Sequence, residues 1–134
     1  MAKQITFDTI IQGGTIVDGS GNARFKCDVG IKNTRIQAVS DLSQAQSGHK
    51  INAADRIVAP GFIDVHTHDD RVILANPTMD MKISQGVTSV VVGNCGISLA
   101  PLVADNPPPP LDLIAEAGAC RYSTFEEFLM EVEG

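Results

Sequence analysis

Two histidines separated by a single residue carry the clearest chemical signal in this sequence. His66 and His68 stand at the end of the compact apolar segment Phe62–His66, which is typical of a short strand. Residues two apart on a strand face the same side, so both imidazoles can reach one point in space. A pair at the end of a buried strand lies where parallel α/β folds place their active sites. Two of the three histidines of the chain fall here, which favours a metal site over two unrelated surface residues.

Aspartates flank this pair on both sides. Asp64 precedes His66 by two residues and is expected to accept a hydrogen bond from an imidazole N–H, as the outer partners of metal-bound histidines do. Asp69 and Asp70 follow directly and make the neighbourhood acidic, which favours a bound cation. The third histidine, His49, has no such setting and is interpreted as a loop residue.

Cys95 is the second candidate ligand. It follows the β-branched run Thr88–Val92, which is typical of a strand buried on both faces, and it stands in a Gly-Asn-Cys-Gly turn. The flanking glycines permit tight backbone geometry and the close approach of a ligand. A lone cysteine near a strand is more often a small buried hydrophobe, and Cys27 and Cys120 keep that interpretation.

The segment before Pro60 has the pattern of a small β domain. Short apolar runs alternate there with turn signals such as Gly13-Gly14 and Gly19–Asn22. This pattern predicts a small antiparallel β-sandwich or barrel, with a surface loop over residues 40–50. The predicted strands are Phe7–Gln12, Thr15–Asp18, Phe25–Ile31, Arg35–Val39 and Arg56–Val58.

After Pro60 the rhythm changes to strand, helix, strand, helix, which is typical of parallel βα units. The strands Phe62–His66 and Thr88–Val92 enclose a predicted helix over Thr78–Gln85, and Gly86 ends that helix. Five prolines between residues 101 and 110 exclude a helix or a central strand from that segment.

The end of the chain carries the signals of a last helix. Ser123 and Glu126 form a possible capping box ahead of the predicted helix Thr124–Glu133. The expected apolar face of this helix consists of Phe125, Phe128 and Leu129.

Composition narrows the class of protein. The hydrophobic fraction of 43% is enough for a core, the aromatic fraction of 4% makes that core aliphatic, and the net charge is −6. An acidic chain of this kind argues against a nucleic-acid partner or an anionic membrane surface. No apolar run is long enough for a transmembrane helix, and Met1–Ile11 lacks the pattern of a signal peptide. Three irregularly spaced cysteines form no disulfide framework, so a reducing cytoplasm is the expected compartment.

Several segments resemble one known family. Val58–His68 resembles the first barrel strand of the amidohydrolase superfamily, and the Gly13–Gly19 opening fits its small β domain. Within that superfamily, Lys82–Ser98 is similar to the N-acyl-D-amino-acid deacylases (D-aminoacylases), and Leu99–Leu102 and Asn106–Leu113 strengthen the match. His-Thr-His alone identifies only the superfamily. Gly-Asn-Cys-Gly is the more specific mark, because most superfamily members have no cysteine ligand there.

The resemblance implies a fold and a set of metal ligands. In an α/β architecture, residues 1–59 would form the N-terminal part of a small β-sandwich or barrel domain, and residues 60–134 the first two βα units of a TIM-like (β/α)8 barrel. Cys95 would hold a tightly bound Zn²⁺ with two histidines from later strands. His66 and His68 would hold a neighbouring metal with an aspartate from the last strand, which also shuttles the proton. The chain is therefore expected to be the N-terminal piece of an enzyme.

The implied reaction is the zinc-dependent hydrolysis of an N-acyl-D-amino acid, a small-molecule partner, to a D-amino acid and a carboxylate. Two alternatives stay open. Another amidohydrolase, such as a hydantoinase or dihydroorotase, would act on a cyclic amide, but those families typically bridge two metals with a modified lysine and Cys95 argues against them. A non-catalytic truncated domain agrees with the short length, and its open strand edges would favour self-association.

Overall fold

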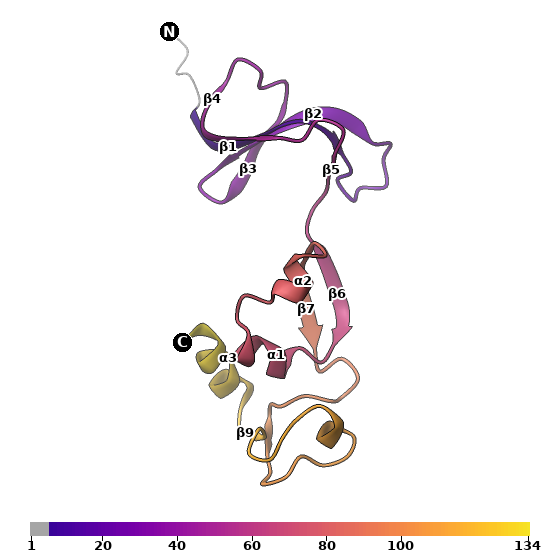
Figure 1. The fold of residues 1–134 in the computed structure, drawn as a ribbon, viewed down its shortest axis with the longest axis vertical. Helices are drawn as coiled ribbons and strands as arrows, with labels where there is room; N and C mark the ends of the chain where they lie inside the picture. Colours follow the sequence, from indigo (N-terminus) through magenta and orange to yellow (C-terminus); the bar gives the residue numbers. More distant parts are fainter. Residues whose placement is uncertain (1–5) are drawn as a thin grey trace. The chain divides into compact units, whose positions relative to one another are not determined.

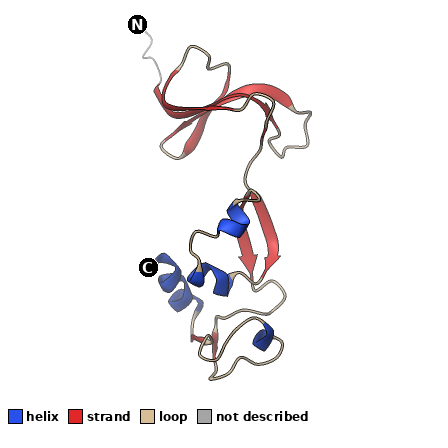
Figure 2. Cartoon of the chain, in the orientation of Figure 1, coloured by secondary structure: helices blue, strands red, loops and turns tan. Residues whose placement is uncertain are grey.

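The computed structural model describes residues 6–134, which contain nine strands, three α-helices and one 3-10 helix (Figures 1 and 2). The chain divides between Pro60 and Gly61 into two compact units. Strands make up the regular structure of the first unit, whereas the second unit mixes short helices and strands (Figure 2). The sequence predicts a boundary between residues 59 and 60, next to the position where the two units separate.

The first unit is built around one mixed sheet of five strands. In space the order is β3-β2-β1-β4, with β5 also paired to β1. β1 runs antiparallel to β2 and parallel to both β4 and β5. The strands are β1 Thr6–Ile16, β2 Phe25–Lys32, β3 Arg35–Ser40, β4 Gln46–Asn52 and β5 Ile57–Val58.

Three predictions for this unit were wrong in detail. The described residues form a single mixed sheet instead of an antiparallel sandwich or barrel. Gly13-Gly14 is no turn, because β1 continues through it with a shift of register between Ile11 and Gly14. The predicted loop over 40–50 contains the start of β4, whose mostly exposed, polar residues lack the alternation that reveals a strand.

A buried carboxylate joins the irregular part of β1 to a neighbouring turn. Asp28 accepts hydrogen bonds from the N–H of Gly13 at 2.7 Å and from the N–H of Leu42 at 3.0 Å. Gly13 has a φ of +75°, which glycine adopts without steric cost, so the bulge needs this residue type. Leu42 packs with Phe7 and Ile10 in the small apolar core of this unit.

The second unit begins with two parallel strands joined by a helical crossover. β6 (Phe62–Thr67) pairs with β7 (Val87–Val92), and α1 (Asp70–Ala75) and α2 (Asp80–Ile83) lie between them in sequence. In Figure 1 the two arrows lie side by side and point the same way. The remaining elements are β8 Leu102–Val103, the 3-10 helix Leu111–Leu113, β9 Arg121–Tyr122 and α3 Phe125–Glu133.

Helix α2 and strand β7 differ from their predicted forms. The helix predicted over Thr78–Gln85 shortens to α2, and α1 was not predicted because six residues are too few for a clear helical period. β7 was predicted to be buried on both faces, but Thr88, Ser89 and Val91 are exposed in the described structure. The sheet that contains β7 has only two strands among residues 6–134, so little covers it.

The core of the second unit is formed by residues that follow β7 in the sequence, and α3 packs into it. Phe128 is 4% exposed and meets the Tyr122 ring edge to face at a centroid distance of 5.5 Å. Cys120 is buried in the same cluster, which confirms its interpretation as a small core residue. The predicted apolar face of α3 was partly wrong, because Phe125 and Leu129 are 46% and 41% exposed. None of the helices described between residues 6 and 134 has the length and apolarity needed to cross a bilayer.

The capping box of α3 lies one residue later than the sequence prediction. The Thr124 hydroxyl accepts a hydrogen bond from the N–H of Glu127 at 3.2 Å. The Glu127 carboxylate accepts in return from the N–H groups of Ser123 and Thr124. Hydrogen bonds from Ser123 are the main reason that the pKa of Glu127 is lowered. The predicted pair Ser123 and Glu126 was therefore shifted by one position, because Ser123 and Thr124 are both good caps and sequence alone does not rank them.

Removing the cap is expected to weaken the second unit. Thr124→Ala should lower the free energy of unfolding by about 1 kcal/mol, because the N–H of Glu127 loses its acceptor. Glu126→Ala is the matched control, since the Glu126 side chain makes no hydrogen bond within residues 6–134. Urea unfolding followed by circular dichroism measures both changes. An equal loss in the control would contradict the assignment of the cap.

Candidate metal centre

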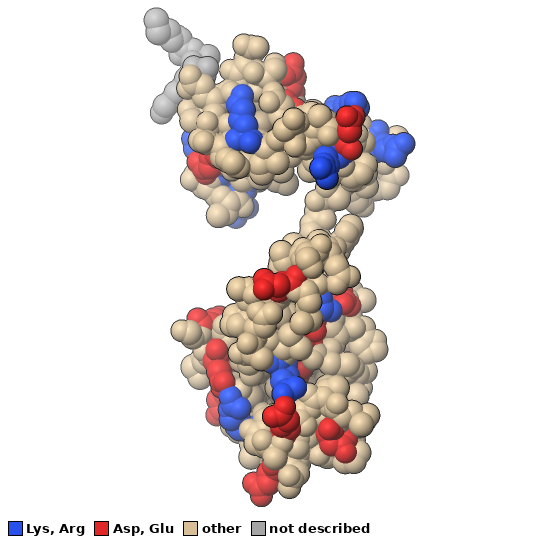
Figure 3. Space-filling model, in the orientation of Figure 1, with Lys and Arg blue, Asp and Glu red and all other residues tan. Residues whose placement is uncertain are grey.

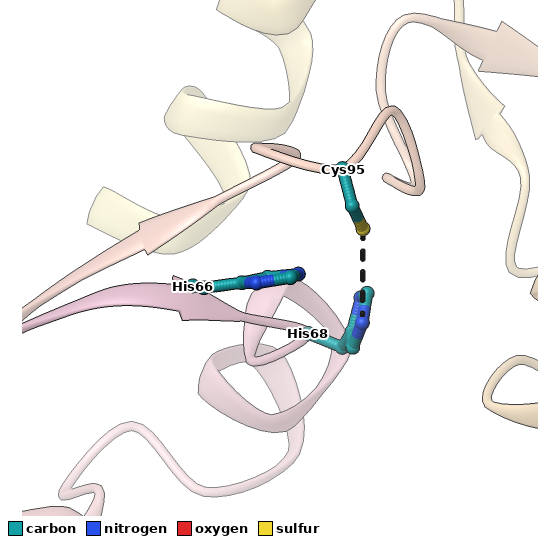
Figure 4. Close-up of side chains that lie close together, drawn as sticks. All are labelled: His66, His68 and Cys95. Atoms are coloured by element: carbon teal, nitrogen blue, oxygen red, sulfur yellow. Dashed lines mark hydrogen bonds between the residues drawn. The ribbon is translucent and has the colours of Figure 1, made fainter.

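The parallel pairing of β6 and β7 brings the three candidate ligands to one edge of the sheet. His66 is the second-last residue of β6, His68 follows the strand directly, and Cys95 stands three residues after β7. The carboxyl ends of parallel strands meet at the same edge, so the three side chains converge from two elements (Figure 4). The predicted juxtaposition of the histidine pair and Cys95 is confirmed.

The shortest distance in the cluster is close to that between two ligands of one zinc. The Cys95 Sγ lies 3.8 Å from the His68 Nε2, shown by the dashed line in Figure 4. A sulfur and a nitrogen bound to one tetrahedral zinc lie about 3.6 Å apart, given the usual bond lengths. The imidazole rings of His66 and His68 are 5.9 Å apart between centroids, with an interplanar angle of 67°.

The three donors form a compact cluster. One ligand atom from each residue lies within 4.8 Å of the other two. These three residues are therefore the candidate ligands of a metal site at the ends of β6 and β7.

The chemistry of the donor set fits zinc. Imidazole nitrogen and thiolate sulfur are preferred Zn²⁺ ligands, whereas Ca²⁺ and Mg²⁺ take oxygen. The Nδ1 atom of His68 is buried and has no hydrogen-bond partner within residues 6–134, so neither ring nitrogen of His68 is committed to a strong protein contact. Cys95 and His66 are exposed, which leaves their ligand atoms accessible.

Asp64 does not accept a hydrogen bond from an imidazole as the sequence suggested, and both Asp64 and Asp69 instead bind a lysine. The Nζ atom of Lys82 in α2 lies 2.8 Å from the Oδ2 atom of Asp64 and 2.9 Å from the Oδ2 atom of Asp69. Asp64 also accepts from the backbone N–H of His66 at 3.3 Å, and it makes no contact with an imidazole N–H among the described residues. The prediction of a carboxylate–imidazole bond was wrong, because one ammonium group from a neighbouring element binds both carboxylates.

The ion pair is stable around neutral pH. The hydrogen bond from Lys82 lowers the pKa of Asp64, and hydrogen bonds to Asp64 and then Asp69 raise the pKa of Lys82. The Asp64 carboxylate contributes to the stability of the folded state above its unfolded-state pKa, and this stability is lost as the pH falls through the lowered folded-state pKa. The Lys82 ammonium contributes to the stability of the folded state below its unfolded-state pKa, and this stability is lost as the pH rises through the raised folded-state pKa.

Asp70 holds the segment that follows Cys95. It is 2% exposed, and its Oδ2 atom accepts a hydrogen bond from the backbone N–H of Leu99 at 2.7 Å. Its Oδ1 atom accepts from the backbone N–H of Arg71. Asp70 was predicted to favour a cation by its charge, but its carboxylate is used inside the fold and lies outside the ligand cluster.

The other candidate residues stay outside the cluster. His49 was predicted in a loop and lies instead in the exposed strand β4 of the first unit. Cys27 is half-buried in β2, and Cys120 is buried in the core of the second unit. Sequence reasoning gave no role to Lys82, although it starts the segment that resembles the D-aminoacylases. A single lysine has no sequence pattern that reveals two acidic partners 18 and 13 positions away.

Comparison with known proteins shows the family. The amidohydrolase family profile matches residues 50–118. This range contains His66, His68 and Cys95 and covers half of the chain. The chain therefore belongs to the amidohydrolase family.

The similar proteins include D-amino-acid deacylases. D-aminoacylase from Alcaligenes xylosoxydans xylosoxydans is 50% identical over 92% of this chain, which corresponds to 25% of the relative. A solved structure of D-aminoacylase, studied for its binuclear metal centre, superposes with a TM-score of 0.89 and 51% identity over 94% of this chain and 27% of its own. N-acyl-D-glutamate deacylase from Bordetella bronchiseptica, in complex with zinc and a phosphonate inhibitor, has a TM-score of 0.87 and 38% identity over 96% of this chain and 27% of its own. The chain thus spans about a quarter of the length of the relatives that it matches.

Loss of the Asp70 carboxylate is expected to destabilise the second unit. Asp70→Ala should lower the free energy of unfolding by about 2 kcal/mol, because the buried N–H of Leu99 loses its acceptor. Asp112→Ala, at an exposed aspartate of the 3-10 helix, is the matched control and should change stability little. Urea unfolding compares the two variants. A loss in Asp70→Ala no larger than that of the control would show that the Leu99 contact contributes nothing to stability.

Proposed function

We propose that this chain supplies metal ligands to a zinc-dependent hydrolase that cleaves the amide bond of N-acyl-D-amino acids. The products are the free D-amino acid and a carboxylate. The observation that carries the proposal is the convergence of two imidazoles and one thiol at the paired ends of β6 and β7. The similarity to D-aminoacylase and to a zinc-bound N-acyl-D-glutamate deacylase supports the choice of metal and of substrate class.

The ligands have separate tasks in this proposal. Cys95 would hold zinc as a thiolate, and His66 and His68 would hold the adjacent position through neutral imidazole nitrogens. Zinc held there would lower the pKa of its bound water to about 7 and would polarise the amide carbonyl. Hydrolysis then adds water across the C–N bond, and one proton must reach the leaving amine. An aspartate outside residues 1–134 takes and returns that proton.

Lys82 and Asp70 hold the segments that carry the ligands and have no part in the proposed reaction. Lys82 binds Asp64 and Asp69 on either side of the histidine pair, which keeps both carboxylates from competing as ligands. Asp70 fixes Leu99, beyond the Cys95 turn. Outer partners of this kind are typically worth about 10–100-fold in metal affinity or activity.

The architecture in the proposal is that of a larger barrel. Residues 61–134 are assigned to the first two βα units of a TIM-like (β/α)8 barrel, and the mixed sheet of residues 6–60 to its accompanying β domain. The parallel pair β6 and β7, with the ligands at its carboxyl end, supports this assignment. A reducing cytoplasm is the proposed compartment, since Cys95 must remain a free thiol and all three cysteines are free.

Replacing the thiol is the direct test of the metal site. In the product of the complete reading frame, Cys95→Ala should lose bound zinc and at least about 100-fold in the rate of D-amino-acid release, more than the loss of an outer partner. Metal content by mass spectrometry and an assay with an N-acetyl-D-amino acid measure the two effects. Cys27→Ala, in the first unit, is the control and should keep both. Full zinc content and activity in Cys95→Ala would contradict the proposal.

Residues 1–134 alone are expected to be inactive. Catalytic zinc usually takes three protein ligands and one water, and here the cluster offers one thiolate and two imidazoles over two positions. Help from a general acid–base group is typically worth about 10²–10⁴ in rate, and that group lies elsewhere. The measurement is amino-acid release by the purified, zinc-loaded segment. Turnover that disappears on Cys95→Ala would mean that the site assembles from this segment or its oligomer.

A further inference from the structure

The ladder between β6 and β7 is interrupted where the ligands begin. Asp64 pairs with Val90, and the next pair is Thr67 with Val92. Three steps along β6 therefore match two steps along β7, so β6 carries one extra residue in the interval that holds Val65 and His66. A bulge of this kind leaves backbone groups without ladder partners and turns the side chains next to it.

A side chain from the other strand end occupies this gap. The Nδ2 atom of Asn94 donates a hydrogen bond to the backbone carbonyl of Val65 at 2.8 Å. Val65 directly precedes His66, and Asn94 directly precedes Cys95. This one contact therefore joins the backbone that carries the first ligand to the turn that carries the last.

The turn itself is closed tightly around Asn94 and Cys95. The N–H of Gly96 donates to the carbonyl of Gly93 at 2.9 Å, which makes Asn94 and Cys95 the two central residues of a β-turn. Gly93 and Gly96 both have positive φ, at +72° and +80°. Within this turn the Asn94 side chain reaches β6, while the Cys95 Sγ reaches His68 (Figure 4).

We infer that Asn94 is a positioning residue that uses its carboxamide on the Val65 carbonyl to hold the Cys95 thiol at metal-ligand distance from the histidine pair. This inference rests on the proposed function, because it assigns a role within the proposed metal site. Cys95 and His68 lie 27 positions apart in sequence, and their 3.8 Å separation depends on how the turn is held against β6. The Asp70–Leu99 bond holds the chain only after the turn, four residues beyond Cys95.

The test uses Co²⁺ as a spectroscopic probe in the full-length protein. Thiolate-to-Co²⁺ charge-transfer absorption reports the Cys95–metal bond directly and does not depend on turnover. Asn94→Asp has nearly the same size but puts an oxygen where the donor was. It should weaken Co²⁺ binding about 10-fold, the lower end for outer partners, and reduce the charge-transfer intensity per bound ion. Asn94→Ala should behave likewise.

Two controls separate positioning from general stability. Asn106→Asp changes an exposed asparagine that makes no side-chain hydrogen bond within residues 6–134, and it should leave the spectrum unchanged. Phe128→Leu disturbs the buried core without touching the Asn94–Val65 hydrogen bond, and it should lower the melting temperature while keeping the charge-transfer band of the bound ion. If Phe128→Leu lost the band as Asn94→Asp does, the effect would be one of stability and the inference would be wrong.

The outcomes distinguish this inference from the function on which it rests. No charge-transfer band in the unaltered protein, or a band that survives Cys95→Ala, would overturn the proposed metal site itself. A band that depends on Cys95 but has the same affinity and intensity in Asn94→Asp would overturn only the positioning role. A band that depends on both residues, with Asn106→Asp unchanged, is the result expected.

Discussion

The parallel pairing of β6 with β7 is the constraint on which the rest of the second unit depends. Two parallel strands must be joined by a crossover, and here α1 and α2 lie in it. The pairing places the carboxyl end of each strand at the same edge, so residues 27 positions apart in sequence come within 3.8 Å. The strands approach closely at their start, where a Cβ on Gly61 would come within 2.0 Å of the Thr88 side chain. Glycine is required at that position for the pair to form in this register.

Charged side chains near the site hold the scaffold together instead of facing a cation. Lys82 forms ion pairs with both Asp64 and Asp69. Asp70 is buried and bonds to backbone N–H groups. Paired groups of this kind fix the geometry of a site, and unpaired charges in the same places would be costly. The donors left uncommitted by this network are one thiol and two imidazoles, a set suited to a borderline-soft ion.

Family membership and local geometry independently support a metal site at the ends of β6 and β7. The amidohydrolase profile covers the segment that holds all three donors, and the geometry brings those donors together at one sheet edge. The first unit contributes no residue to this cluster, which consists of His66, His68 and Cys95. On the face shown in Figure 3, acidic and basic side chains are interspersed in each unit, and no continuous basic patch is visible among the described residues.

The sequence by itself determined the identity of the candidate ligands and the approximate places of most strands. Histidines two apart at a strand end and a cysteine after a β-branched run are local patterns, and local patterns are visible without a fold. The tertiary structure alone decided which groups surround those ligands. Lys82 binds Asp64, which therefore does not contact the imidazoles, and Asn94 donates a hydrogen bond to the Val65 carbonyl. β4 forms from polar residues at a sheet edge. The two side-chain contacts join residues 18 and 29 positions apart, and β4 depends on pairing with another strand. A short-range sequence pattern does not indicate which distant group a residue will contact.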